Sequence, residues 1–370
     1  MPGKQLSDLC VDCSDAEAIL TLRSRHLCKT CYARFVNFKV FKRMENYRLR
    51  RNMPRTGPCK LLVPLSCGIS SSVLLHILNT QIQHELAKSH PSPGFDLHVL
   101  VIEPSSISHS SPSYDEGFGL LQQTFPLHSF TRIPLHSIFE LDPEIQQVIS
   151  QFSKDGFVDD TGLSAKDRLD AFRASIVTPT SKVDVDYVLI TRLVVAFAKQ
   201  MACRGVLWGD SDTRLAAKTL ANVAKGRGSS LTWQVCDGMS PFGIEFNFPL
   251  RDLFKAEVDN YASFFPELTR LIIPDEPPSE NVLTKNLSID ELMMRYVQTQ
   301  GEKYPGVMAN VTRTASKLQA SLVPANIPQC SFCGACMLNS GNNGARDTAG
   351  ASRALELCYA CTRSRPELTY

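Results

Sequence analysis

Apolar runs alternate with stretches of helical periodicity through the middle of this chain. Short apolar runs that fit buried strands lie at residues 61–65, 97–102, 130–133 and 205–208. Residues 73–86, 185–203 and 213–224 place apolar side chains at helical spacing. Strands that alternate with helices are joined by crossovers and run parallel. The pattern therefore predicts an α/β fold built on a doubly wound parallel sheet.

Three further segments mark the limits of this pattern. Residues 140–184 combine short helical patterns with glycine breaks, which predicts an insertion of undefined shape. The serine-rich residues 105–113 predict a surface loop, and the prolines of 274–278 predict a linker ahead of a helix at 289–298. We expect a cysteine-rich, basic segment at 1–56, an α/β domain at 57–275, and a helical, cysteine-rich segment at 276–370.

Composition places the chain among globular proteins. It has 370 residues, 43% of them hydrophobic, and a net charge of +2, so any affinity for nucleic acid must come from local charge. The N-terminal residues lack the apolar stretch of a signal peptide, and Arg192 and Lys199 interrupt the most apolar helical segment. We therefore expect a cytoplasmic protein without membrane contact. In that reducing compartment, 13 cysteines favour metal sites or free thiols over disulfides.

Two cysteine pairs near the N-terminus have the spacing of a metal site. Cys10 and Cys13 form one pair, and after fourteen intervening residues Cys28 and Cys31 form a second. Four thiolates in two such pairs can surround one tetrahedral ion and leave no open position for catalysis. The spacing predicts a structural zinc site, against the alternative of four ordinary core cysteines.

The C-terminal segment offers five cysteines for a site that needs four. Omitting Cys336 leaves two regular pairs, which makes the predicted ligands Cys330, Cys333, Cys358 and Cys361. Zinc is the expected ion here too. An iron-sulfur cluster, which thiolates alone can also hold, stays open as the alternative.

Eight cations lie between Arg34 and Arg55, where Glu45 is the one acidic residue. Aromatic residues alternate with these cations, so a helix here would bury aromatic side chains on one side and present positive charge to RNA phosphates on the other. The alternative is a solvated helix face. The predicted RNA contacts are Lys39, Lys42, Arg43, Arg48, Arg50 and Arg51.

Small residues fill the turn between the first predicted strand and its helix, at residues 65–72. Such a turn lets backbone approach a phosphate, and the start of the helix supplies N–H donors. The lysine of a Walker loop is missing. The candidate nucleotide contacts are Ser66, Gly68, Ser70 and Ser71, and plain helix capping is the alternative.

This turn resembles the SGGxDS loop of the N-type ATP pyrophosphatase family. Residues 209–216 resemble the family's GHNxDD segment, and residues 248–253 resemble its proline-containing stretch before a helix. The N-terminal cysteine pairs look like those of cytosolic tRNA thiolation enzymes. The likeness covers nearly the whole chain, and it implies an adenine nucleotide alpha hydrolase-like sheet flanked by two zinc modules.

Departures from the family pattern concern the residues that carry chemistry. Cys67 replaces a glycine, Ser70 replaces the aspartate, and the 209–216 segment lacks the histidine. Residues 168–175 hold no cysteine where catalytic relatives carry a CxxC pair, and the isolated Cys203 and Cys236 fit inert core thiols better than sulfur carriers. We therefore expect no catalytic residues in this chain. Whether the loop still binds ATP stays open.

The resemblance implies a non-catalytic subunit of a tRNA-thiolating heterodimer. Its partner would be a catalytic paralogue that adenylates the wobble uridine of the tRNAs for Lys, Glu and Gln. Sulfur from a thiocarboxylated ubiquitin-related modifier would then replace the 2-oxygen of that base, which gives mcm5s2U. Two alternatives remain, an active ATP-dependent tRNA sulfurtransferase and a zinc-stapled protein scaffold that does not bind RNA.

Overall fold

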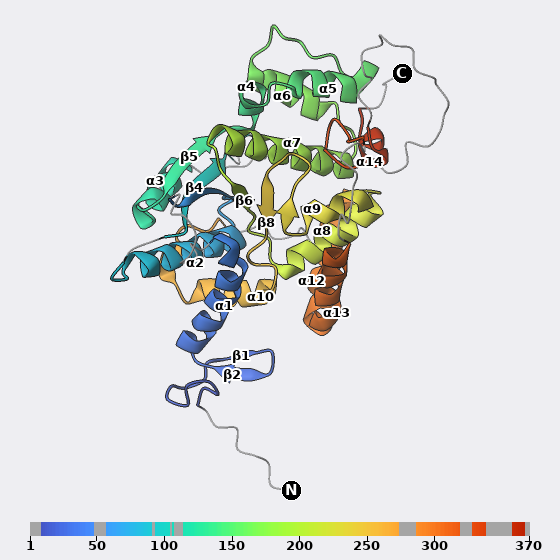
Figure 1. Ribbon diagram of the computed structural model, residues 1–370. Helices are drawn as coiled ribbons and strands as arrows, with labels where there is room; N and C mark the ends of the chain where they lie inside the picture. The colour runs from blue at the N-terminus through green and yellow to red at the C-terminus, as the bar shows by residue number, and fades with distance from the viewer. Residues whose placement is uncertain are drawn as a thin grey trace.

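A six-stranded sheet forms the centre of the molecule (Figure 1). The computed structural model describes residues 9–47, 57–90, 93–103, 106, 114–273, 286–318, 328–337 and 357–366. The strands are β3 (Cys59–Pro64), β4 (Phe95–Ile102), β5 (Ser129–Ile133), β6 (Gly205–Leu207), β7 (Gly238–Met239) and β8 (Glu245–Asn247), in the order β5-β4-β3-β6-β8-β7. All neighbours pair in parallel except β7 with β8. The α/β prediction is confirmed, and the unpredicted antiparallel edge is a strand too short to produce a periodic pattern.

Helices cover both faces of the sheet because successive strand residues point to opposite sides. Leu61 and Val63 of β3 pack with α1 (Lys29–Arg43), α2 (Ile69–Leu86) and α10 (Lys255–Ser263). Leu62 packs with α7 (Pro179–Gln200) and α9 (Leu231–Gln234) on the other face. The nearly continuous apolar runs of the sequence follow from this burial on both sides. Helices α3 (Tyr114–Thr124) and α11 (Pro266–Thr269) complete this α/β unit.

The predicted insertion is helical. Helices α4 (Ile138–Leu141), α5 (Ile145–Ser153) and α6 (Ala165–Ala174) pack against the first half of α7. Helix α7 begins at Pro179, earlier than the predicted residue 185, so the end of the predicted insertion belongs to this helix. The early start is explained by the Thr-Pro pair, which is a helix-start signal in the sequence. Thr178 accepts a hydrogen bond from the Ser181 N–H, and Pro179 occupies the first turn.

A helical hairpin packs on α8 (Asp212–Ala224) at the lower right of Figure 1. It consists of α12 (Ile289–Lys303) and α13 (Pro305–Lys317). The predicted helix at 289–298 is real but longer, and α13 was not predicted. The last described helix, α14 (Tyr359–Arg363), lies near the start of α7 with the C-terminal cysteines. The predicted linker at 274–278 and, apart from Ser106, the predicted loop at 105–113 lie outside the described residues.

The N-terminal segment forms a two-stranded hairpin, β1 (Leu20–Leu22) and β2 (Arg25–Leu27), followed by α1. The buried side of α1 holds Cys31, Tyr32, Val36 and Val40. Among the aromatic residues that alternate with the cations, Phe38 departs from the predicted buried side, because it is 62% exposed. Over the described ranges, none of the helices combines the length and the apolar character needed to cross a membrane.

Candidate metal centres and the altered nucleotide loop

The N-terminal cysteines converge around one point. The sulfurs of Cys10, Cys13, Cys28 and Cys31 all lie within 4.8 Å of one another. Cys28 is the N-cap of α1 and Cys31 lies in its first turn, so the helix start fixes the second pair. Burial disfavours a thiolate at Cys10, but backbone N–H groups of Cys28, Cys13 and Asp12 outweigh it and lower its pKa to about 6. The Cys10 sulfur is therefore biased toward the form that binds metal, whereas burial and the neighbouring cysteine sulfurs raise the pKa of Cys31 to about 12.

This module is tied to the core through α10. Arg23, at the tip of the hairpin, donates to both carboxylate oxygens of Glu257 at 2.6 and 2.9 Å and to the Asp252 carbonyl. Its guanidinium also lies over the Phe254 ring, 4.7 Å from the centroid. The buried Tyr32 hydroxyl donates to the Glu257 carbonyl at 2.8 Å. The N-terminal cysteine group is thus held in a fixed place against the α/β unit.

The C-terminal cysteines form a second group of four. The sulfurs of Cys330, Cys333, Cys358 and Cys361 lie within 4.8 Å of one another, and Cys336 is not among them. Gly334 has φ +72°, a left-handed turn that glycine adopts without steric cost, and its N–H donates to the Cys330 carbonyl. These features make the knuckle that joins the first two sulfurs.

Both donor sets fit a single tetrahedral ion. Four sulfurs at about 2.3 Å from one zinc ion lie about 3.8 Å apart. The Cys13 and Cys28 sulfurs are 3.8 Å apart, and those of Cys333 and Cys358 are 3.6 Å apart. A four-iron cluster needs a wider cage, because each of its cysteines binds a different iron.

Two buried residues that the sequence patterns did not indicate lie beside the C-terminal group. Arg227 donates to the Cys361 sulfur at 3.3 Å and to the Cys358 sulfur at 3.9 Å. Its Nε also donates to Asp184 at 2.9 Å, and both side chains are only 2% exposed. Burial works against the Asp184 carboxylate, but Arg227 and Lys225 outweigh it and lower its pKa. Neither residue has a local sequence signal, since 134 residues separate Arg227 from Cys361.

The side chain of a second arginine holds the backbone of the same C-terminal segment. Arg192 of α7 donates to the carbonyls of Ser331 and Phe332 and pairs with Asp142 at 2.7 Å. The Phe332 ring stacks on Phe152 with centroids 4.1 Å apart. The C-terminal knuckle therefore shares its buried core with α5, α6 and α7.

The altered nucleotide loop lies at the reversal point of the sheet. The chain runs from β3 outward to β5 and then returns to β6 on the other side of β3, so the β3–α2 and β6–α8 turns meet. A Cβ atom at Gly209 would lie 2.8 Å from the Ser71 Cα, which shows how closely these turns approach. In α/β sheets, this crevice is where ligands bind.

Within this loop the hydroxyl groups bond to one another. The Ser66 and Ser71 oxygens are 3.2 Å apart, the Ser71 hydroxyl donates to the Gly68 carbonyl, and the Gly68 N–H points at Ser66. Ser70 is half-buried in the first turn of α2. Cys67 has φ +57°, a left-handed conformation that explains why the family pattern has glycine at this position.

The carboxylates of the adjoining β6–α8 turn are engaged in part, because the Oδ2 atom of Asp212 is buried without a hydrogen-bond partner among the described residues. Asp210 pairs with Lys218 at 2.5 Å and with Arg214 at 3.1 Å. Asp212 accepts a hydrogen bond from Thr312 of α13, and burial raises its pKa. With serine at position 70, this edge is a poor match for the carboxylate ligands that Mg²⁺ prefers.

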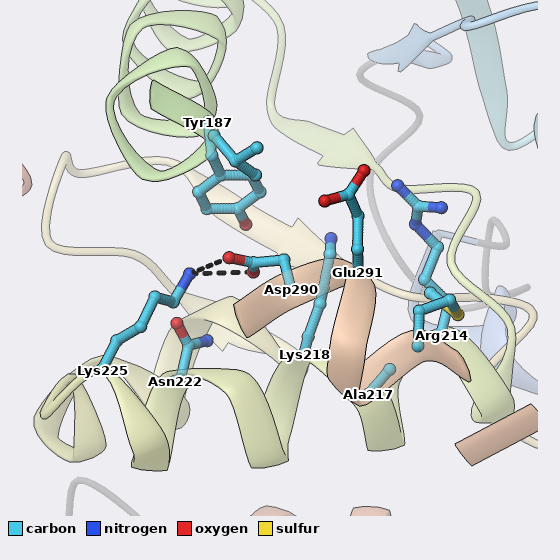
Figure 2. Close-up of a pocket in the computed structure, with 10 residues that line it drawn as sticks. Tyr187, Arg214, Ala217, Lys218, Asn222, Lys225, Asp290 and Glu291 are labelled. Atoms are coloured by element: carbon cyan, nitrogen blue, oxygen red, sulfur yellow. Dashed lines mark hydrogen bonds and ion pairs between the residues drawn. The ribbon is translucent and has the colours of Figure 1, made fainter. Parts of the chain in front are cut away.

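A pocket of about 270 Å³ lies between α7, α8 and α12 (Figure 2). Its charged groups largely neutralise one another, since Lys225 donates to both oxygens of Asp290 and Lys218 to Asp210. Lys225 also lies 3.1 Å from Asp184. The pocket wall is thus linked to the ion pair beside the C-terminal cysteines.

The predicted RNA contacts differ in their surroundings. Lys42 is exposed, and the Lys39 ammonium lies 5.5 Å from the Phe35 ring centroid. Arg43 forms two 2.8 Å hydrogen bonds with Asp252, which join α1 to the core. Arg48, Arg50 and Arg51 lie outside the described residues.

The isolated thiols are poor nucleophiles. Cys203 and Cys236 are buried, and burial raises the pKa of each. Burial also raises the pKa of Cys67 to about 11. A thiol acts as a nucleophile in its thiolate form, so none of the three is poised to carry sulfur at neutral pH.

Comparison with solved structures places this fold beside a tRNA-modifying enzyme. The U34-tRNA thiolase NcsA from Methanococcus maripaludis, solved with its 4Fe-4S cluster, matches with a TM-score of 0.58 at 14% identity. The match covers 90% of this chain and 92% of that one. At this identity the likeness shows the fold alone.

Sequence relatives are far closer. The cytoplasmic tRNA 2-thiolation protein 2 of Neosartorya fischeri is 94% identical over the full length of both chains, and that of Aspergillus clavatus is 79% identical over the same extent. The family profile described as cytoplasmic tRNA 2-thiolation protein 2 matches residues 288–354. The chain belongs to the cytoplasmic tRNA 2-thiolation protein 2 family.

Proposed function

We propose that this protein is a supporting, non-catalytic subunit in the 2-thiolation of tRNA. The observation that carries the proposal is a nucleotide-type loop whose chemistry is altered. Ser70 stands where the family pattern has aspartate, and Ser66 and Ser71 bond to each other. The names of the curated relatives and the thiolase fold support the pathway.

The roles of the two subunits follow from the altered nucleotide loop of this chain and from the cysteine groups and basic segment that it retains. A catalytic paralogue would adenylate the wobble uridine of the tRNAs for Lys, Glu and Gln and accept sulfur from a thiocarboxylated ubiquitin-related modifier. This chain would bind tRNA in the cytoplasm and hold that partner in a heterodimer. We assign tRNA binding to residues 1–56, a structural role to the α/β domain at 57–275, and stabilisation to residues 276–370.

We propose zinc for both cysteine groups. The sulfur separations of 3.8 and 3.6 Å favour one ion per group over a four-iron cluster. Cys10, Cys13, Cys28 and Cys31 would hold the first ion, and Cys330, Cys333, Cys358 and Cys361 the second. Zinc bound by four thiolates would supply structural cross-links and no catalysis.

Reconstitution tests the central proposal. We expect tRNA thiolation and ATP-dependent adenylation only when this chain is mixed with its catalytic partner, and neither reaction with this chain alone. The double change Ser66→Ala with Ser71→Ala should leave the activity of the mixture unchanged, because the proposed role needs no ATP here. Thiolation by the purified chain alone, at the rate of the mixture, would contradict the proposal.

The RNA role is tested at the two lysines of α1 with the fewest competing contacts. Changing Lys39 and Lys42 to alanine should weaken tRNA binding and reduce the slope of log affinity against log salt by about 1 per lost phosphate contact. The matched control removes the exposed Lys166 and Lys199, which lie on α6 and α7. Equal salt slopes for the two double variants would favour a scaffold that does not bind RNA. Arg43 is unsuitable for this test, because its loss also breaks the pair with Asp252.

A further inference from the structure

Among the described residues, Arg227 is the feature beside the C-terminal cysteines that packing of this segment against the helices does not explain. Its guanidinium is buried and reaches two cysteine sulfurs, at 3.3 and 3.9 Å, while Asp184 holds its other edge. Asp184 is itself fixed by the Ser364 hydroxyl at 3.1 Å and by Lys225. Three separate parts of the chain therefore meet at this one ion pair.

The charge of a thiolate centre explains why a cation is needed there. Four thiolates around a divalent ion carry a net charge of about −2, and burying that charge is costly unless a partner compensates it. Three of these four cysteines are buried, and Cys358 is half-buried. In the N-terminal group Cys13 is exposed, so water can solvate that centre.

We propose that Arg227, positioned by Asp184, is the buried counter-cation of the C-terminal thiolate centre and sets how tightly that centre holds its metal. The inference rests on the metal site proposed above. Arginine suits the role because its planar group can donate to a carboxylate and to sulfur at the same time, and it keeps its charge when buried. Residues in this outer layer orient and tune the ligands of metal sites.

Arg192 provides a matched control. It is also a buried arginine paired with an aspartate, and it holds the same knuckle through the Ser331 and Phe332 carbonyls. The hydrogen bonds of Arg192 reach backbone oxygen, whereas those of Arg227 reach sulfur. Removing Arg192 therefore tests how the C-terminal knuckle is held against the neighbouring helices. Removing Arg227 tests the same attachment together with the positive charge at the sulfurs.

The experiment follows metal release at each site in the full-length, zinc-loaded chain. Excess EDTA is added at a temperature at which every variant is folded, and freed thiols are alkylated over time. Mass spectrometry of peptides then gives separate release rates for the two cysteine groups. We expect Arg227→Met to speed release from the C-terminal group by about 10- to 100-fold and leave the N-terminal group unchanged. Arg227→Lys should lie between Arg227→Met and the unaltered chain, because it keeps the charge.

The possible results distinguish a failure of the proposed role of Arg227 from a failure of the metal site on which it rests. Equal acceleration by Arg227→Met and Arg192→Met would overturn the inference and leave a docking role alone. Unchanged release in Arg227→Met would overturn it as well. If the C-terminal cysteines of the unaltered chain alkylate immediately without EDTA, there is no metal at that site, and both the inference and the proposed site fail.

Discussion

Replacing Cys361 with serine is expected to release the C-terminal metal and to destabilise the helices packed beside it. Structural zinc contributes about 10–16 kcal/mol of apparent binding free energy in small domains, and loss of one thiolate forfeits much of it. The effect should spread, because Cys361 and Phe332 share a buried cluster with α5, α6 and α7. Metal content should fall from two ions to one per chain, and hydrogen exchange should speed up in α5 and α6.

The spare cysteine supplies the control. Cys336 lies in the same knuckle but outside the group of four sulfurs, and it is half-buried. Cys336→Ser should keep two metal ions and the exchange protection of the unaltered chain. Loss of metal in Cys336→Ser, or its retention in Cys361→Ser, would show that the ligand set is wrong.

Acid is expected to destabilise the protein well above the pH at which its carboxylates titrate. Burial lowers the pKa of His128 from 6.5 to about 4, and its Nε2 atom is buried without a hydrogen-bond partner. Below pH 6.5 the unfolded chain takes up a proton that the folded chain excludes, so stability falls as the pH falls toward 4. Between about pH 7.5 and about pH 4.5 this one residue should cost about 2.5 kcal/mol. Burial lowers the pKa of His76 and His98 too, which adds in the same direction.

The variant His128→Gln isolates this contribution. It cannot titrate, so its free energy of unfolding should fall less steeply with acid, as measured by urea denaturation at several pH values. Metal loss in acid affects both proteins alike and cancels in the comparison. Asp184, Asp210 and Asp252 have lowered pKa values, so their ion pairs weaken only below the ordinary aspartate range. Parallel pH profiles for the two proteins would contradict the assignment to His128.

Features encoded over a few neighbouring residues could be predicted from the sequence. The strands β3, β4 and β6 are short, mostly apolar runs, and burial on both faces makes such runs visible without an alignment. The edge strand β5 has no fully buried residue, and Phe130 and Ile133 were its apolar signal. The cysteine pairs are equally local, because two residues of spacing place both sulfurs on one knuckle. The departure at Ser70 was readable for the same reason. Boundaries were less exact, as the early start of α7 at Pro179 shows.

Features that depend on distant pairing needed the tertiary structure. Nothing near Arg227 in the sequence shows that it meets Asp184 and Cys361, and nothing near Arg43 shows that it pairs with Asp252 instead of facing solvent. The packing of the C-terminal knuckle against the predicted insertion was equally invisible. By itself the sequence determined four of the six described strands, the two groups of cysteines and the altered loop, since these depend on periodicity and short spacing. The strands β7 and β8 were not predicted. The partners of buried charges were decided by tertiary packing, because any charge can pair with any opposite one until the fold brings two of them together.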